Sequence, residues 1–159
     1  MIDGENKLNA SDRLLEFTEG IQNYIDGKNL GPPRFNEEHR TPETYTTQRL
    51  EALTKDECFN AAYMLYQYAD YINSEKCSQE NVISWCEKAL NTIISTEIED
   101  MPQFTKHDIK VAHILRANDL AKKISEWKSV AEGRITALGN KEYNVRKKAD
   151  CLMEKGKRR

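Results

Sequence analysis

Apolar residues recur every three or four positions in the stretch that follows Thr54. This spacing is typical of a helix that presents one apolar, coiled-coil-like line to a partner. Thr54 and Glu57 fit a capping box at its start, in which each side chain bonds the other's free backbone amide. The pattern therefore predicts a helix that begins at Thr54 and buries one face. The residues of this face are Cys58, Ala62, Leu65, Ala69 and Ile72.

A second apolar stripe follows a short polar stretch. Residues 73–78 are mostly polar and predict a turn, with Ser78 as the N-cap of the next helix. The acidic stretch 96–103, which contains Pro102, is expected to end that helix. Two striped helices joined by a short link predict an antiparallel helical hairpin. The second stripe consists of Val82, Ile83, Cys86, Ala89, Leu90, Ile93 and Ile94.

The last third of the chain predicts a long C-terminal helix with coiled-coil-like heptads. Thr105 has capping character, and residues 105–155 form either one helix or two collinear helices. Gly139-Asn140 is the expected break, because both residues favour a left-handed C-cap. An adjacent series of Ile114, Ala121, Ile135 and Ala149 widens the apolar stripe. One heptad position stays apolar through six repeats, which are Ala117, Ile124, Ala131, Leu138, Val145 and Leu152.

A companion heptad position changes character along this helix. It begins apolar at Leu120 and Trp127, and Trp127 is expected to lie in the core. It then turns basic at Arg134, Lys141 and Lys148. This change motivates the hypothesis that the C-terminal end contacts another subunit or a polyanion rather than the chain's own core.

The first 53 residues predict an N-terminal arm. Residues 11–26 fit a short amphipathic helix, and residues 27–49 contain three prolines and little periodicity, which predicts an extended connector. The expected organisation is an arm over 1–53 and a helical domain with a basic tail over 54–159. The apolar side of the arm helix would be Leu14, Phe17, Ile21, Tyr24 and Ile25.

Composition agrees with an all-α, non-membrane protein. Hydrophobic residues make up 38% of the chain and charged residues 31%, which suits helices with wide solvated faces. No apolar run approaches the roughly 20 residues that span a bilayer, and the first residues lack a signal peptide's features. The four cysteines form no CxxC pair, and thiols are the default in a reducing compartment. The expected location is cytoplasmic, and a Cys77–Cys86 disulfide is left open.

Charge is distributed unevenly along the chain. The net charge is only −2, but residues 1–104 hold 9 basic and 19 acidic side chains, whereas residues 105–159 hold 15 basic and 7 acidic ones. A basic end indicates an anionic partner. The same asymmetry also permits head-to-tail self-association, or an acidic arm that folds back on the basic part.

Motifs for catalysis or metal binding are not found in the sequence. His107 and His113 are six residues apart and do not share a helical face, and no cysteine joins them at zinc-ligand spacing. There is no GxxxxGK[ST] loop, no GxGxxG after a strand and no GxSxG. We therefore expect a protein that is not an enzyme, holds no cofactor or metal, and acts by binding partners.

Nucleic acid is the leading expected partner. Repeated cations neutralise phosphates with little demand on geometry, and Tyr143 could stack on a base. The absence of helix-turn-helix, zinc-finger and RRM signatures favours single-stranded or nonspecific binding. The candidate nucleic-acid-binding residues are Lys122, Lys123, Lys128, Arg134, Lys141, Tyr143, Arg146, Lys147, Lys148, Lys155, Lys157, Arg158 and Arg159.

Three segments resemble small helical proteins of tailed phages, in the style of UvsY-type recombination mediators. They are ECFNAAYMLYQYADYI over residues 57–72, WCEKALNTII over residues 85–94, and AEGRITAL over residues 131–138 with its basic continuation. The resemblance covers roughly residues 55–159. It implies an oligomeric protein that binds single-stranded DNA and helps to load a recombinase, and it transfers no individual residue.

Two hypotheses from different classes follow. The first is a non-enzymatic accessory protein that binds single-stranded nucleic acid, in its narrower form a phage recombination mediator. The second is a helical interaction module, such as a phage assembly, adaptor or inhibitor protein, that does not bind nucleic acid. The salt dependence of binding affinity distinguishes the two hypotheses, because phosphate contacts weaken steeply as salt rises and an apolar helix contact does not.

Overall fold

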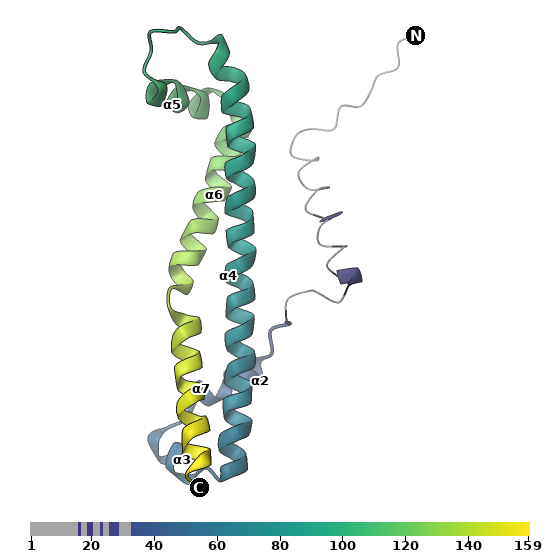
Figure 1. Ribbon diagram of the computed structural model, residues 1–159, viewed down its shortest axis with the longest axis vertical. Helices are drawn as coiled ribbons and strands as arrows, with labels where there is room; N and C mark the ends of the chain where they lie inside the picture. The colour runs from purple at the N-terminus through teal and green to yellow at the C-terminus, as the bar shows by residue number, and fades with distance from the viewer. Residues whose placement is uncertain (1–15, 17–18, 21–22, 24–25, 29–32) are drawn as a thin grey trace. The chain divides into compact units, whose positions relative to one another are not determined.

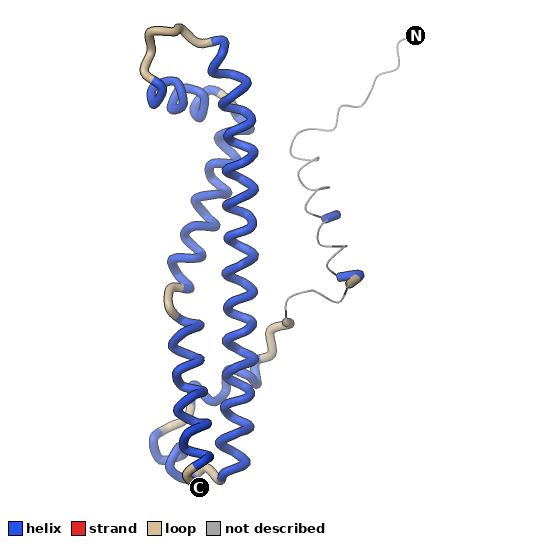
Figure 2. Tube along the Cα trace, in the orientation of Figure 1, coloured by secondary structure: helices blue, strands red, loops and turns tan. Residues whose placement is uncertain are grey.

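The structure is a computed structural model that describes residues 16, 19–20, 23, 26–28 and 33–159. The five apolar residues predicted for the arm helix lie outside these described residues. In the described part of the chain the regular elements are helices and there is no strand (Figure 2), which confirms the all-α prediction. The elements are α2 (Glu37–Arg40), the 3-10 helix η1 (Thr41–Thr44), α3 (Thr47–Ala52), α4 (Lys55–Glu97), the 3-10 helix η2 (Ile98–Asp100), α5 (His107–Ala117), α6 (Asp119–Leu138) and α7 (Lys141–Lys157).

The chain divides into two compact units. Of the described residues, unit 1 includes residues 85–128 and the few before residue 32, and unit 2 includes residues 33–84 and 129–159. Helices α4 and α6 each contribute one end to each unit.

Helix α4 is continuous over 43 residues, so the predicted turn at residues 73–78 and the N-cap at Ser78 are wrong. The stretch contains no glycine or proline, and its polar residues each cost a helix only a few tenths of a kcal/mol. The apolar spacing also continues in phase across it. From Ile72 the steps of four, three and four residues lead through Lys76 and Gln79 to Ile83. The helix that pairs with the start of α4 is therefore the C-terminal one.

The predicted capping box at the start of α4 is confirmed. The Thr54 amide donates to Glu57 Oε2 at 2.8 Å, and the Glu57 amide donates to Thr54 Oγ1 at 3.3 Å. Arg49 also donates to Glu57 Oε1 at 3.2 Å. The backbone hydrogen bond from Thr54, with Arg49 as a further cause, lowers the pKa of the Glu57 carboxyl below its ordinary value.

Replacing Thr54 with alanine is expected to destabilise the fold by about 1 kcal/mol, the usual cost of a lost N-cap. Because the pKa of Glu57 is depressed by folding, its contribution is present above the pKa of the unfolded chain and is lost as pH falls through the folded value. A Glu57→Gln variant should therefore lose less stability than the wild type between pH 6 and pH 3. Thermal melts at several pH values check this, and identical pH profiles for the two proteins would contradict it.

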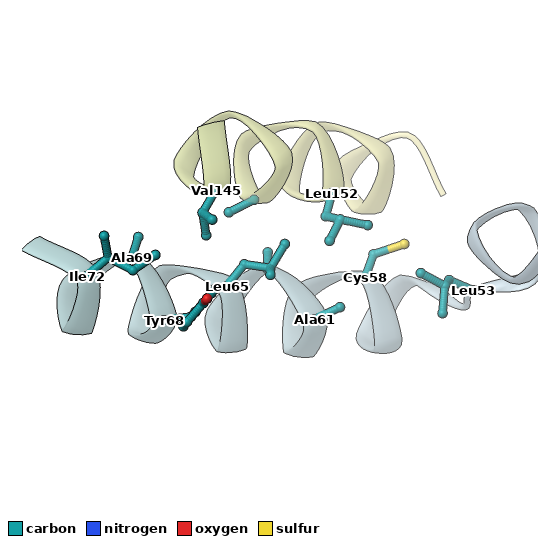
Figure 3. Packing of buried hydrophobic residues seen from close by; sticks show 11 residues of the cluster. Leu53, Cys58, Ala61, Leu65, Tyr68, Ala69, Ile72, Val145 and Leu152 are labelled. Carbon is teal, nitrogen blue, oxygen red and sulfur yellow. The ribbon is translucent and has the colours of Figure 1, made fainter. Parts of the chain in front are cut away.

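The core of unit 2 is formed where α7 runs antiparallel to the first half of α4 (Figures 1 and 3). The line predicted from Thr54 onward is buried as expected. Val145, Ala149 and Leu152 are also at most 6% exposed and join the same cluster. A Cβ atom on Gly156 would lie 2.7 Å from the Phe59 ring, so α7 approaches α4 closely there. The core cluster is Leu53, Cys58, Ala61, Ala62, Leu65, Tyr68, Ala69, Ile72, Val145, Ala149 and Leu152.

The apolar line of the C-terminal helix therefore packs into the chain's own core, so the part of the hypothesis that kept this end away from the core is wrong. Contact of this end with another subunit or a polyanion stays a prediction. The break predicted at Gly139-Asn140 is confirmed, with Gly139 at a φ of 48°. A second break occurs at Asn118, whose Oδ1 accepts the Ala121 amide at 3.0 Å. Ala117 ends α5 at this break and is exposed. Thr105 does not cap α5, which begins at His107 without a side-chain cap.

Three short helical elements lie in residues 37–52, most of which fall within the extended connector predicted for residues 27–49, so that prediction is wrong there. Asn36 Oδ1 accepts the Glu38 amide at 3.0 Å, and Thr46 Oγ1 accepts the Arg49 amide at 3.1 Å, so two of these elements carry side-chain caps. Pro42 stands at the start of η1, where a missing amide costs nothing, and it is buried. Pro42 therefore opens a helical turn rather than marking extended chain. Leu53, which follows α3, is only 1% exposed.

Unit 1 is built from the last part of α4, η2, α5 and the first part of α6. The Asn118 amide group donates to Glu97, and Lys128 pairs with Glu87 at 3.4 Å. Trp127 is 51% exposed, with its ring centroid 6.4 Å from that of Trp85, so the prediction that it lies in the core is wrong. The buried apolar residues that the structure describes in this unit are Cys86, Leu90, Ile114, Ala121 and Ile124.

All four cysteines are free thiols. Cys77 and Cys86 are nine residues apart on α4, a rise of about 13 Å, which a disulfide cannot bridge. Cys86 is buried, and this burial raises the pKa of its thiol. Among the described residues, no helix combines the length and apolar character needed to cross a membrane.

Candidate nucleic-acid interface

The solvent side of α7 carries the densest group of predicted binding residues. A shallow groove of about 710 Å³ is lined by α7 and the residues that follow it, and we call it the α7 groove. It contains four cations and two carboxylates, a net charge of +2. Tyr143, 61% exposed, stands one turn before the first of these cations. The lining residues are Lys147, Asp150, Cys151, Glu154, Lys155, Arg158 and Arg159.

The groove arises from helical spacing. Lys147, Cys151, Lys155 and Arg158 follow one another at three or four residues, which places them on one face of α7. The opposite face carries Val145, Ala149 and Leu152 and is fixed against α4. Packing of the apolar face therefore turns the cationic face toward solvent.

The two carboxylates of the α7 groove are already engaged. Asp150 accepts the Tyr66 hydroxyl at 2.6 Å and lies 3.9 Å from Lys147. The hydrogen bond to Asp150, together with burial, raises the pKa of Tyr66 above its ordinary value. Glu154 accepts from Lys157 at 2.8 Å, and this bond lowers the pKa of Glu154. Lys147 also lies 5.4 Å from the centroid of the Tyr143 ring, so a cation and an exposed aromatic face stand together.

Several predicted cations of unit 2 lie outside the groove and bind the chain's own acids. Arg146 donates to Asp70 at 2.7 Å and to Glu142 at 2.9 Å, and these bonds raise the pKa of its guanidinium. Lys148 pairs with Glu43 at 3.2 Å. The acidic segment before α4 thus folds back on α7 at one point, an alternative that the sequence had left open.

Of the remaining candidates of unit 2, Lys157 pairs with Glu154, whereas three others contact uncharged groups. Lys141 lies 5.4 Å from the centroid of the Tyr68 ring, and Arg134 donates to Gln79 at 3.4 Å. Arg159, at the end of the α7 groove, donates to the Glu51 carbonyl. Lys155 and Arg158 make no side-chain hydrogen bond or ion pair with the described residues, and they are the cations of the groove most open to a new anion.

Unit 1 holds the other three predicted cations. Lys128 is half-buried and pairs with Glu87, whereas Lys122 and Lys123 are exposed. Neither Lys122 nor Lys123 forms an ion pair within the part of the chain that the structure describes. Arg116 on α5 was not singled out from the sequence, although its charge was visible there; the break at Asn118 that follows it was not predicted.

Among the described residues, no three His, Cys, Asp or Glu side chains lie close enough together to hold a metal ion. Comparison with protein-family models, with curated proteins and with solved structures finds no match to this chain. The resemblance to UvsY-type mediators therefore stays a prediction from the sequence.

Proposed function

We propose that this chain is a non-enzymatic accessory protein that binds single-stranded nucleic acid through the α7 groove. The observation that carries the proposal is the groove itself, which holds four cations on the solvent face of a helix whose other face is fixed in the core. The first of these cations, Lys147, lies 5.4 Å from the ring centroid of the exposed Tyr143, one turn before the groove. Cations at repeated spacing bind phosphates, and an exposed aromatic ring stacks a base of any identity. DNA is the expected nucleic acid.

Two ion pairs of α7 are compatible with this role because their lysine ends are exposed, although Glu43 itself is only 20% exposed. In the Lys148–Glu43 pair the lysine side chain is 56% exposed, and in the Lys147–Asp150 pair it is 59% exposed. Such pairs contribute about 0–1 kcal/mol each. A phosphate can therefore replace the carboxylate at small cost.

Exchange of carboxylate for phosphate gives a testable prediction at Glu43. A Glu43→Gln variant frees Lys148 and should tighten oligonucleotide binding about two- to fivefold at low salt, the equivalent of one exposed pair. Glu37→Gln is the matched control, since it removes the same charge from a pair with Arg40 in α2. Equal effects of the two substitutions would mean that net charge, rather than release of Lys148, governs binding.

Fluorescence anisotropy of a labelled oligothymidylate at 50 and 200 mM salt tests the proposal directly. We expect saturable binding at the lower salt and a steep loss at the higher salt, because each phosphate contact releases a counterion. Double-stranded DNA of equal length should bind more weakly, since its bases are not open to Tyr143. No binding of the oligothymidylate at 50 mM salt would refute the proposal.

The narrower form of the proposal is a phage recombination mediator, an oligomer that helps to load a recombinase on single-stranded DNA in the cytoplasm. Its support is the resemblance of residues 55–159 to UvsY-type proteins, and free thiols suit a reducing compartment. Sedimentation with and without oligonucleotide measures the oligomer. A monomer in both conditions would remove this narrower form and leave nucleic-acid binding in place.

A helical protein–protein interaction module is the second candidate. The observation that favours it is the set of large apolar side chains exposed in unit 1, where Phe104 is 101%, Ile109 57% and Trp127 51% exposed. An apolar contact through these residues would be nearly indifferent to salt. Trp85 and Trp127 are the two tryptophans of the chain, so intrinsic fluorescence reports directly on a partner bound there.

A further inference from the structure

A second groove lies within unit 1, where α5 ends and α6 begins. It encloses about 550 Å³ and is lined by Ala112, Leu115 and Arg116 from α5 and by Lys122 from α6. The break at Asn118 creates it, because the chain leaves α5 and enters α6 within two residues (Figure 1). We call it the α5–α6 groove.

The α5–α6 groove combines an apolar part with two available cations. Ala112 and Leu115 are half-buried, whereas Arg116 and Lys122 are exposed. Neither cation forms an ion pair or a side-chain hydrogen bond with any residue that the structure describes. Asp119 is three residues from each of them in sequence, yet it pairs with neither. A guanidinium offers a planar fork that binds two phosphate oxygens at once, and an ammonium adds a second positive charge.

We propose that the α5–α6 groove is a nucleotide subsite, which holds one phosphate of single-stranded DNA between Arg116 and Lys122 and the attached sugar and base against Ala112 and Leu115. This inference rests on the proposed function and extends it to a second place on the chain. Charge complementarity selects a polyanion as the occupant. A polynucleotide supplies both the phosphate and a flat apolar group at every residue, which an acidic peptide does not.

Two measurements test the subsite on the full chain. Methyl resonances of Ala112 and Leu115 should shift as a pentathymidylate is added at 50 mM salt and should saturate together with its binding curve. The double variant Arg116→Gln, Lys122→Gln should bind a labelled 20-residue oligothymidylate more weakly, with a salt dependence of log affinity that is shallower by roughly 1. The double variant Arg40→Gln, Lys88→Gln removes the same two residue types elsewhere and is the matched control.

The outcomes distinguish this inference from the proposed function. If the oligonucleotides bind but the two methyl groups do not shift and both double variants behave alike, the subsite is refuted and nucleic-acid binding stands. If neither oligonucleotide binds at 50 mM salt, the subsite and the proposed function are both refuted. If hexaglutamate or an anionic phosphatidylserine vesicle shifts the same methyl groups at lower concentration than the pentathymidylate, the assigned occupant is wrong.

Discussion

Replacing Lys147, Lys155 and Arg158 with glutamine should abolish most of the salt-dependent affinity for single-stranded DNA. If the four cations of the α7 groove each meet one phosphate, their contribution to log affinity falls by about 2.8 per tenfold rise in salt. That slope is a loss of about 50-fold between 50 and 200 mM salt. With Arg159 alone left, the loss from the groove shrinks to about threefold.

A matched variant separates this effect from net charge. Lys55, Lys76 and Lys88 all lie on α4 and outside the α7 groove, so changing these three to glutamine removes the same charge. Anisotropy titrations at several salt concentrations give the slope for each protein. Equal slopes for the two triple variants would contradict a specific role for the α7 groove. Circular dichroism confirms that both variants keep their helix content.

Replacing Leu65 with alanine should destabilise unit 2 by about 2–5 kcal/mol. Leu65 is 1% exposed at the centre of the contact between α4 and α7, and its removal leaves a cavity that surrounding side chains only partly fill. Tyr63 is 63% exposed on the same helix, and its replacement with alanine should cost no more than about 0.5 kcal/mol.

Urea unfolding followed by circular dichroism measures both variants. The large difference is expected because only Leu65 belongs to the cluster that joins the two helices (Figure 3). If both substitutions cost the same small amount, α7 does not pack on this face of α4, and the orientation of the α7 groove toward solvent loses its basis.

Local rules predicted much of the fold. The capping box at Thr54, the buried line that follows it and the break at Gly139 all depend on neighbouring residues, and all three are confirmed. The turn predicted at residues 73–78 is wrong because the prediction gave more weight to the polar character of these residues than to the helical spacing, which continues through them. The apolar spacing from Ile72 to Ile83 preserves the alternation of three and four, and this was the available signal for one continuous helix.

The heptad position predicted at Trp127 is shifted by one residue from the position that packs in the structure. The residues of α6 that are buried or half-buried run through Ala121, Ile124, Lys128 and Ala131, at steps of three and four. Lys128 therefore occupies the seam position beside Trp127, and its ammonium reaches Glu87 at the edge. The prediction placed the apolar Trp127 in the seam instead of Lys128, but the methylene stem of a lysine can lie along an apolar seam while its charge stays in water.

The candidate site was only partly visible from sequence. Composition located the cations, and helical spacing could place several of them on one face of α7. The partners of Arg146 and Lys148 are Asp70 and Glu43, which lie 76 and 105 residues away along the chain. Only tertiary structure brings such residues together. Arg116 and Lys122 likewise line one groove only because the helix breaks at Asn118.

Alkylation of the exposed cysteines offers the most direct test of where nucleic acid binds. Cys151 lines the α7 groove, and Cys77, also exposed, lies on α4 outside it. Mass spectrometry can follow the reaction of each thiol with a maleimide, with and without saturating oligothymidylate at 50 mM salt. We expect the oligonucleotide to slow alkylation of Cys151 severalfold and to leave Cys77 unchanged. An unchanged rate at Cys151, while anisotropy shows the oligonucleotide fully bound, would contradict binding in this groove.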